Sequence, residues 1–388
     1  RTNFFGPVPG HSDAYLVKHT LIHAWARQIG DREQTVLGRK IDDRLKAMLG
    51  DDENAQLMRH YGAALQNLIR GGRVSDAFRL AEKLDHRLES LGLWAERRHF
   101  WESVAAQLQE QKSTHMGSLA KAVHKLATVY LDLGQYEKAQ KLFRQSEEYS
   151  QRSDSIAHAA NLIGLGIAAK RKEDLIGAQK LFEEGLNHAV KSGDPYAIAL
   201  AQNELGTAYK GLQRSDEAED LFDRSFRSLA ELDAKIERTD AMHLKYAGAL
   251  GLVEMNQGNL ARSEKQYERA EKKLLASMAR FVEADDQVNL AHARQNFGQL
   301  LMRVGKDDKL AGQYLMEAVV KYRSLDAQGQ DLGNCLYRLA ILARRAGDCT
   351  TARKHLQESL PILTATAAPL LTEARNFQQS LSGKGCKR

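Results

Sequence analysis

The chain repeats one helix–turn–helix pattern seven times, and this repetition limits the folds it can adopt more than any other feature. The turn between the two helices of each unit is marked by Gly92, Gly134, Glu173, Gln213, Gly258, Gly305 and Gly347, at intervals of 42, 39, 40, 45, 47 and 42 residues. Five of the markers are glycine, which adopts the positive φ needed where a helix ends abruptly. Such a period predicts a stack of similar helical hairpins.

Both helices of each unit carry the same packing residues. The second helix has a small residue, then a bulky residue four positions later, then another small residue three positions after that. The bulky positions are Trp101, Phe143, Phe182, Phe222, Tyr267, Leu315 and Leu356, and the sixth unit has one extra residue after its turn. The first helix carries a Leu-Gly or Leu-Ala pair, as in Leu165-Gly166. Spacings of three and four keep these residues on one helical face.

These positions make the chain resemble a long-period tetratricopeptide-repeat (TPR) array. Residues 126–146 (LATVYLDLGQYEKAQKLFRQS) and 205–225 (LGTAYKGLQRSDEAEDLFDRS) match that motif at most positions, although the proline that usually closes it is missing. The resemblance covers about residues 75–360. It implies an all-α, right-handed superhelical solenoid of about seven TPR-like hairpins, preceded by an N-terminal helical segment.

A second resemblance concerns Tyr61–Val104. Ala63, Ala64, Leu65 and Leu68, followed by a Gly92-x-Trp94 turn, are similar to the helix that leads into the TPR sensor region of STAND/NB-ARC-class signalling ATPases. This resemblance implies that the chain is the sensor arm of a larger switch, with an ATPase domain of the same parent chain as a partner. The first residue is Arg1 rather than methionine, so we expect a chain that is processed or cut from a longer one.

The sequence predicts three segments. Residues 1–72 form an extended lead-in around Pro7 and Pro9 and then three helices, at about 12–29, 32–49 and 54–70. Residues 73–365 form the repeat array. Residues 366–388 form a capping helix that ends near 381 and a disordered basic tail.

Charge and cysteine content narrow the class of protein. The net charge is +6 and the isoelectric point is near 9.0, but residues 1–110 hold 16 basic and 15 acidic side chains and show no long basic stripe. Nucleic acid is therefore an unfavourable partner. No apolar run is long enough to cross a bilayer. Cys335, Cys349 and Cys386 form no even framework or metal spacing, which favours a reducing, cytoplasmic location; a cleaved targeting segment would leave no trace.

No catalytic, cofactor-binding or metal-binding motif is found. The sequence has no phosphate loop, no His-Glu-x-x-His and no Cys-x-x-Cys. His19 and His23 lie four residues apart, as two metal ligands on a helix would, but no third ligand is near and the plainer interpretation is two polar helix positions. We expect Cys335 to be a small buried side chain, and Trp94, Phe100 and Trp101 to pack in the core. The sequence therefore predicts a protein that is not an enzyme.

In the resembled family the first helix of each unit lines a concave groove. The ligand-facing positions of that helix can be matched one by one to residues of this chain. The resulting partner-binding set is Lys121, His124, Lys125, Lys170, Arg171, Asn203, Lys210, His292, Gln295, Asn296, Gln299, Arg303, Asn334, Tyr337 and Arg338. The same positions also include Asp132, Glu204, Lys245, Asn256, Arg344 and Arg345, so ten basic residues stand against two acidic ones. The plain alternative is that these are merely solvated helix faces.

The excess of positive charge predicts a scaffold or sensor that binds an acidic peptide or partner protein in this groove, anchored by Lys121, Lys125, Asn296, Arg303 and Arg338. Asn296 and Arg338 match two positions of a known carboxylate clamp, but Gly248 and Leu252 replace two others. One alternative is a peptide-responsive receptor whose N-terminal helices hold an effector, similar to peptide-sensing bacterial regulators. Another is an RNA-binding helical repeat, which periods of 39 to 47 residues disfavour.

Overall fold

The computed structural model describes residues 5–7, 15–17, 68–69, 71–91, 94–110, 116–150, 154–237, 241–324, 329–365, 368 and 370–381. The chain divides into two compact units, Arg1–Leu84 and Asp85–Arg388. In the first unit, strand β1 (Phe5–Pro7) pairs antiparallel with β2 (Tyr15–Val17), with Phe5 opposite Val17. The helix predicted from residue 12 therefore does not include Tyr15–Val17. The other two helices predicted in this segment lie almost wholly outside the described residues.

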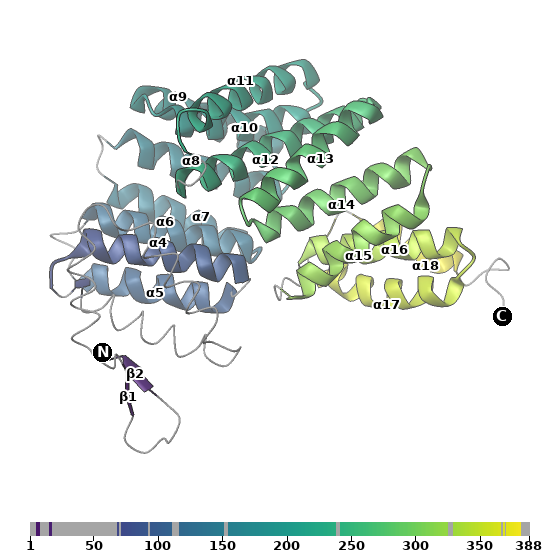
Figure 1. The fold of residues 1–388 in the computed structure, drawn as a ribbon, viewed down its shortest axis with the longest axis horizontal. Helices are drawn as coiled ribbons and strands as arrows, with labels where there is room; N and C mark the ends of the chain where they lie inside the picture. The colour runs from purple at the N-terminus through teal and green to yellow at the C-terminus, as the bar shows by residue number, and fades with distance from the viewer. Residues whose placement is uncertain are drawn as a thin grey trace. The chain divides into compact units, whose positions relative to one another are not determined.

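Fifteen helices, α4 to α18, occupy the described residues (Figure 1). Their bounds are α4 Val74–Leu91, α5 Trp94–Glu110, α6 Met116–Asp132, α7 Tyr136–Tyr149, α8 Ser155–Arg171, α9 Leu175–Ser192, α10 Pro195–Gly211, α11 Ser215–Asp233, α12 Ala241–Ser263, α13 Tyr267–Glu283, α14 Gln287–Val304, α15 Asp308–Ser324, α16 Gln330–Arg345, α17 Cys349–Ala365 and α18 Leu371–Ser380.

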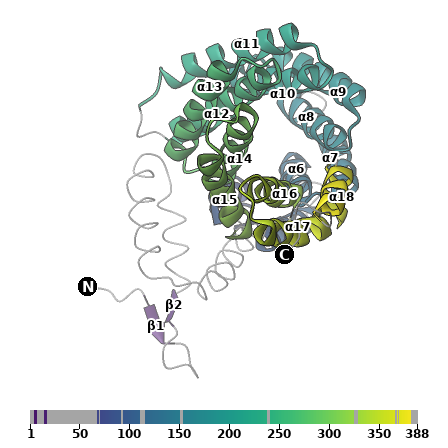
Figure 2. The same cartoon turned by 90° about the vertical axis from the view of Figure 1, so that its right-hand side faces the viewer.

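In the second unit the helices follow one another as hairpins. We call the first helix of each pair an A helix (α6, α8, α10, α12, α14 and α16) and the second a B helix (α7, α9, α11, α13, α15 and α17). Each A helix packs against its own B helix and against the next A helix. Figure 2 shows the A helices on the inner side of this array and the B helices on the outer side. The predicted all-α solenoid of helical hairpins is therefore confirmed.

Each hairpin is closed by a bulky B-helix side chain that lies against a small A-helix residue. Phe182 and Phe222 are fully buried. A Cβ atom added to Gly166 would lie 2.5 Å from the Phe182 ring, and one added to Gly206 would lie 2.7 Å from the Phe222 ring. The recurring Leu-Gly pairs of the sequence are thus the sites where two helices approach most closely.

A recurring serine adds a second link between the two helices. The Oγ of Ser146 donates to the backbone carbonyl of Ala120 at 2.8 Å, and Ser225 and Ser359 make the same bond to the carbonyls of Ala199 and Gly333, at 2.7 Å each. All three serines are buried. In these repeats the small residue in the last position of the B-helix pattern therefore donates a hydrogen bond, and its small size also lets the two helices pack closely.

A residue in the left-handed conformation lies in the turn between the two helices of each hairpin from α6 to α17. Gly134, Glu173, Gln213, Gly305 and Gly347 have φ between 61° and 81°, as their role as turn markers predicts. In the fifth unit, however, the left-handed residue is Lys265, with φ 62°. The prediction that Gly258 marks this turn is wrong, because the glycine lies inside the 23-residue helix α12.

Gly258 has a different role from the one predicted. A Cβ atom there would lie 2.8 Å from the Cγ of Leu274, so Gly258 is the fifth unit's counterpart of Gly166 and Gly206. Leu274 is fully buried, whereas Tyr267, the predicted bulky residue of this unit, is half-buried. Two of the three glycines of α12, Gly251 and Gly258, are seven residues apart and each lies against a bulky side chain of α13, which explains why the sequence alone gives a register seven residues too early.

Other core predictions have mixed outcomes. Phe100 and Trp101 are buried and their rings meet edge to face, and Cys335 is a buried free thiol. Cys349 is disulfide-bonded, so the prediction that the cysteines form no bonded framework is wrong there. Helix α18 lies where a final helix was predicted, and residues 382–388, the predicted disordered tail, lie outside the described residues.

Two substitutions test the corrected turn. We expect Gly258→Ala to lower the free energy of unfolding by about 1–3 kcal/mol, because the new Cβ would overlap Leu274. We expect Lys265→Gly to raise it by about 0.5–1 kcal/mol, because it removes a side chain from a left-handed residue. Urea unfolding followed by circular dichroism measures both.

Gly117→Ala is the matched control, because nothing lies within 4 Å of a Cβ added at that helical glycine. We expect this substitution to be neutral or slightly stabilising. If Gly258 were the turn residue, the signs would differ: Lys265→Gly would destabilise a helix interior by about 1 kcal/mol.

Candidate functional site

The A helices bring a row of basic side chains together. Lys170 (α8), Lys210 (α10) and Arg262 (α12) each stand three residues before the left-handed turn residue of their repeat. Arg303 on α14 and Arg338 on α16 stand at other positions, two residues before Gly305 and nine before Gly347, and their charges act on Arg262. Successive A helices are neighbours, so equivalent positions lie next to one another along the layer. We call these five residues the inner basic surface.

The first member of the inner basic surface has an acidic partner. The Nζ of Lys170 lies 2.8 Å from Glu204 Oε2 and 2.6 Å from the Thr207 hydroxyl, both on the next A helix. The Lys170 side chain is 24% exposed and that of Glu204 is 20% exposed. This ion pair therefore joins α8 to α10 and neutralises one charge.

The following members are not neutralised in this way. Burial, together with the charges of Lys170 and Arg262, lowers the pKa of Lys210 to about 8. Burial and the charges of Arg338 and Arg303 lower the pKa of Arg262 to about 10. Among the described residues, no carboxylate forms a salt bridge with Lys210, Arg262, Arg303 or Arg338. The inner basic surface thus holds positive charge at an electrostatic cost.

Amide groups lie between these cations. Arg262 donates through one nitrogen to the carbonyl of Asn296 and to Gln299 Oε1, at 3.1 Å each. The Asn256 amide donates to the Asn203 side-chain oxygen at 2.9 Å. Asn203 is buried and its own amide donates to Glu204 at 3.3 Å. Predicted residues Asn203, Asn296 and Gln299 therefore belong to the contacts between A helices.

Several other predicted groove residues bridge helices and are not open to a partner. His124 Nδ1 lies 2.8 Å from Asn161 Oδ1, and its ring meets the Phe143 ring edge to face. Burial lowers the pKa of His124, so the imidazole is held neutral. The Lys125 ammonium lies 3.3 Å from the buried Asp85 carboxylate. Both residues stabilise the N-terminal hairpins of the unit.

Predicted groove residues near α16 also make contacts within the protein. His292 Nε2 lies 3.3 Å from Asp331 Oδ2, and the Gln295 amide donates to the same carboxylate at 3.4 Å. Tyr322 donates its hydroxyl hydrogen to Gln295 at 2.7 Å. Tyr337 is buried and its ring meets Phe377 edge to face. His292, Gln295 and Tyr337 therefore act mainly in packing.

The remaining predicted residues have different surroundings. Lys121 and Arg171 are exposed. The Lys245 ammonium lies 4.0 Å from the centre of the Tyr196 ring, and Arg345 is paired with Asp308 at 3.1 Å. Asn334 is half-buried, and its side-chain oxygen accepts no hydrogen bond within the described residues.

Arg262 is the residue that sequence reasoning missed. With the fifth turn placed at Gly258, Arg262 falls after the turn and outside the first helix. With the turn at Lys265, it occupies the same position as Lys170 and Lys210. One sequence signal could have identified Arg262: in two neighbouring repeats, a basic residue stands three places before the turn.

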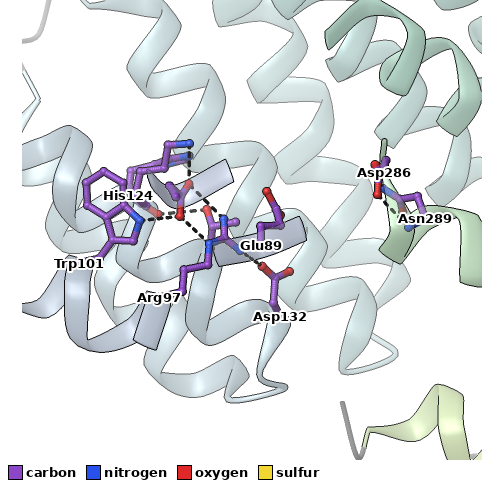
Figure 3. A network of polar contacts seen from close by, with 10 residues as sticks. Glu89, Arg97, Trp101, His124, Asp132, Asp286 and Asn289 are labelled. Carbon is purple, nitrogen blue, oxygen red and sulfur yellow. Dashed lines mark hydrogen bonds and ion pairs between the residues drawn. The ribbon is translucent and has the colours of Figure 1, made fainter. Parts of the chain in front are cut away.

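A second charged cluster lies at the start of the unit and includes Arg97, Trp101 and Asp132 (Figure 3). Asp85 is at its centre, because Arg97, Trp101 and Lys125 all donate to its carboxylate. Arg97, which is 2% exposed, donates to Asp85 at 2.5 and 3.2 Å and to Asp132 at 3.0 Å. The Trp101 indole donates to Asp85 at 2.7 Å. These bonds join α4, α5 and α6, and they connect positions that no local sequence pattern links.

The carboxylates of this cluster have opposite pKa shifts. Burial opposes ionisation of Asp85, but hydrogen bonding and the charge of Arg97 outweigh it and lower the pKa of Asp85. Burial raises the pKa of Asp132 to about 6 despite the nearby Arg97 charge. Asp132, predicted as an acidic groove position, is therefore a partner of Arg97 inside this cluster.

The described residues contain no cluster of three or more His, Cys, Asp or Glu side chains that could hold a metal ion. No helix in the described ranges has both the length and the apolar character needed to cross a membrane. His19 and His23 lie outside the described residues.

The family model of the tetratricopeptide repeat matches residues 118–189, which include α6 to α9. The chain carries tetratricopeptide repeats. No curated protein sequence matches it. The match ends well before α17, so the later repeats are recognised from their helical hairpins and from the packing residues that they share with the matched ones.

One of the similar solved structures, with a TM-score above 0.5, shows the same fold. A Rap protein complexed with Competence and Sporulation Factor is similar with a TM-score of 0.51 at 15% identity, over 84% of this chain and 99% of that protein. BtubC from P. vanneervenii has a TM-score of 0.43 at 19% identity, over 62% and 92% of the two chains.

A STAND protein with a tetratricopeptide repeat sensor, from Pyrococcus horikoshii, has a TM-score of 0.48 at 17% identity, over 95% of this chain and 58% of that one. At such low identity these similarities bear on the fold alone. Residues 61–67 lie outside the described part of the chain, so the resemblance of Tyr61–Val104 to a STAND lead-in stays a prediction.

The Asp85 cluster gives a stability prediction. We expect Asp85→Ala to lower the free energy of unfolding by about 3–5 kcal/mol, because it leaves the buried Arg97 guanidinium without its main partner. Urea unfolding followed by tryptophan fluorescence measures this directly, since Trp101 donates to Asp85. Asp220→Ala is the control: its exposed pair with Arg224 contributes less than about 1 kcal/mol. Equal losses in the two variants would contradict a structural role for the buried cluster.

Proposed function

We propose that this chain is a non-enzymatic protein-interaction scaffold whose inner basic surface binds an acidic peptide segment or the acidic face of a partner protein. The observation that carries the proposal is the row of cations from Lys170 to Arg338, of which only Lys170 is paired with a carboxylate among the described residues. Tetratricopeptide repeats offer a layer of A helices on which such a row is continuous.

The electrostatics support an anionic ligand. The pKa values of Lys210 and Arg262 are lowered because each cation is partly removed from water and lies near other cations. A carboxylate that binds between them would relieve this repulsion and form charge-assisted hydrogen bonds in a partly desolvated place. The same fold with neutral side chains at these positions would have no reason to prefer an acidic partner.

One further feature suits a peptide. Asn296 and Gln299 lie three residues apart on the face of α14 that Arg262 contacts. Amides next to cations provide hydrogen bonds that do not depend on the peptide's side chains.

A peptide-responsive receptor is the second candidate. The Rap protein, whose solved structure contains Competence and Sporulation Factor, shares this chain's fold over most of both lengths. In this candidate the acidic segment is a small peptide and residues 12–70 hold an effector. A sensor arm attached to an ATPase domain is a further form of the same idea. RNA is disfavoured because the basic surface is short and lies in a nearly charge-balanced chain.

A charge reversal tests the proposed ligand class. We expect Arg303→Glu/Arg338→Glu to weaken the binding of a fluorescein-labelled oligoglutamate peptide by at least about tenfold, which corresponds to 1.4 kcal/mol. Fluorescence anisotropy measures the affinity. The matched control is Lys180→Glu/Arg227→Glu, which makes the same change in net charge at exposed positions on the B helices α9 and α11. Equal weakening in both variants would mean that only net charge matters, and would remove the inner basic surface as the site.

The lowered pKa of Lys210 gives a pH dependence. Lys210 is cationic below about pH 8 and loses its charge above it, so we expect peptide affinity to fall between pH 7 and pH 9. The effect on stability has the opposite sign: the unfolded chain binds the proton more tightly, so this residue makes folding more favourable as pH rises from about 8 to 10.5. In Lys210→Arg the affinity should stay constant over pH 7–9, as anisotropy titrations will show. A wild-type affinity that does not change over this range would contradict the assignment.

A further inference from the structure

Three arginines converge at the C-terminal part of the inner basic surface, from three successive A helices. Arg262 of α12 contacts the Asn296 carbonyl and the Gln299 side chain, so its guanidinium lies on one face of α14. Arg303 lies on the same face, because positions 296, 299 and 303 follow a spacing of three and four. Arg338 comes from α16, which packs against α14. We call Arg262, Arg303 and Arg338 the arginine cluster.

No carboxylate among the described residues forms a salt bridge with the arginine cluster, although the charge of Glu373 favours the charged form of Arg338. Burial lowers the pKa of Arg338, as it does that of Arg262, and the three charges repel one another. The Nε of Arg338 is buried with no acceptor among the described residues. One helical turn before it, the Asn334 side-chain oxygen is buried with no donor. These two atoms are buried, so an external ligand would meet the exposed Arg303 and the outer atoms of the half-buried Arg262 and Arg338.

Other arginines of the same fold show what compensation looks like. Arg97 is surrounded by three carboxylates, and Arg345 and Arg269 are each paired with one. The arginine cluster differs because its only described partners are a backbone carbonyl and an amide oxygen, both bound to Arg262. Neutral acceptors orient a guanidinium but leave its charge in place.

The number and shape of the donors select among anions. A single carboxylate brings one negative charge and two oxygens, which can satisfy one guanidinium fork. A phosphate monoester brings about −1.5 to −2 charges and three acceptor oxygens, and so can be shared by several forks. Arginine, unlike lysine, presents planar paired donors that fit phosphate oxygens. Three converging arginines therefore favour phosphate over carboxylate.

We propose that the arginine cluster binds the phosphate group of a phosphorylated side chain in the partner peptide. This inference rests on the proposed function, because it specifies one residue of the acidic segment that the inner basic surface binds. Lys170 and Lys210, further along the same surface, then bind the acidic residues that flank the phosphorylated one. Phosphorylation of the partner would switch its affinity for the scaffold.

Three fluorescein-labelled peptides test the inference on the full chain. They share acidic flanks and differ at one central residue, which is phosphoserine, glutamate or serine. We expect the phosphoserine peptide to bind at least about tenfold more tightly than the glutamate peptide, since only the phosphate can bridge several arginines. Anisotropy titrations give the three affinities, and competition with inorganic phosphate shows whether the peptide is needed.

Variants of the arginine cluster separate geometry from charge. Arg303→Lys and Arg338→Lys keep the charge but lose the planar fork, so we expect each to reduce the phosphoserine preference to about threefold or less. Arg303 is exposed, so its substitution does not endanger folding, and circular dichroism checks that both variants remain helical. Lys180→Arg, on the outer helix α9, should leave the preference unchanged.

The possible outcomes are distinct. Equal affinity for the phosphoserine and glutamate peptides would overturn this inference and leave the proposed function standing. Failure of all three peptides to bind would overturn both. Inorganic phosphate that competes at the same concentration as the phosphopeptide would show a site for the free anion and overturn the peptide assignment. A preference that persists in both lysine variants would place the phosphate elsewhere.

Discussion

The structure depends on one packing contact, in which a bulky B-helix side chain lies against a glycine or alanine of its A helix. Phe182 against Gly166 and Phe222 against Gly206 are the clearest cases, with no room for a further carbon atom. This contact fixes the distance and rotation of the two helices in each hairpin. Because it recurs at the same place in successive repeats, it also places successive A helices in the same rotation. Side chains at equivalent positions consequently form a row.

The row explains how an almost charge-balanced chain concentrates positive charge. A basic residue three places before a turn is unremarkable in one helix, but Lys170, Lys210 and Arg262 repeat it in neighbouring repeats. Burial and the charges of Lys170 and Arg262 lower the pKa of Lys210, and burial and the charges of Arg338 and Arg303 lower the pKa of Arg262. The packing that stabilises the solenoid thus forces these cations together, and the cost of their proximity is retained in the folded protein.

Sequence periodicity was sufficient to predict the hairpins, most of their turns and most of the packing residues, because each follows from spacing along one helix. It failed in the fifth repeat, where Gly251 and Gly258 both match the packing glycine and the true turn at Lys265 has no glycine. Contacts between helices were not predictable in this way. Lys125 and Asp132 bind Asp85 and Arg97, which lie some 30 to 40 residues earlier in the chain. Such pairings depend on the three-dimensional arrangement of helices and leave no local pattern.

Arg97 and the arginine cluster differ in how their charge is compensated. Arg97 is completely surrounded by Asp85, Glu89 and Asp132, so its charge is used within the protein and stabilises three helices. The arginine cluster of Arg262, Arg303 and Arg338 has only neutral acceptors among the described residues, so its charge is left for an anion from outside. A cation that is paired with carboxylates inside the protein has little net charge left to attract a partner, whereas an unpaired one favours an anionic ligand. The degree of this pairing, rather than the number of basic residues, is therefore the property on which the proposed interaction surface depends.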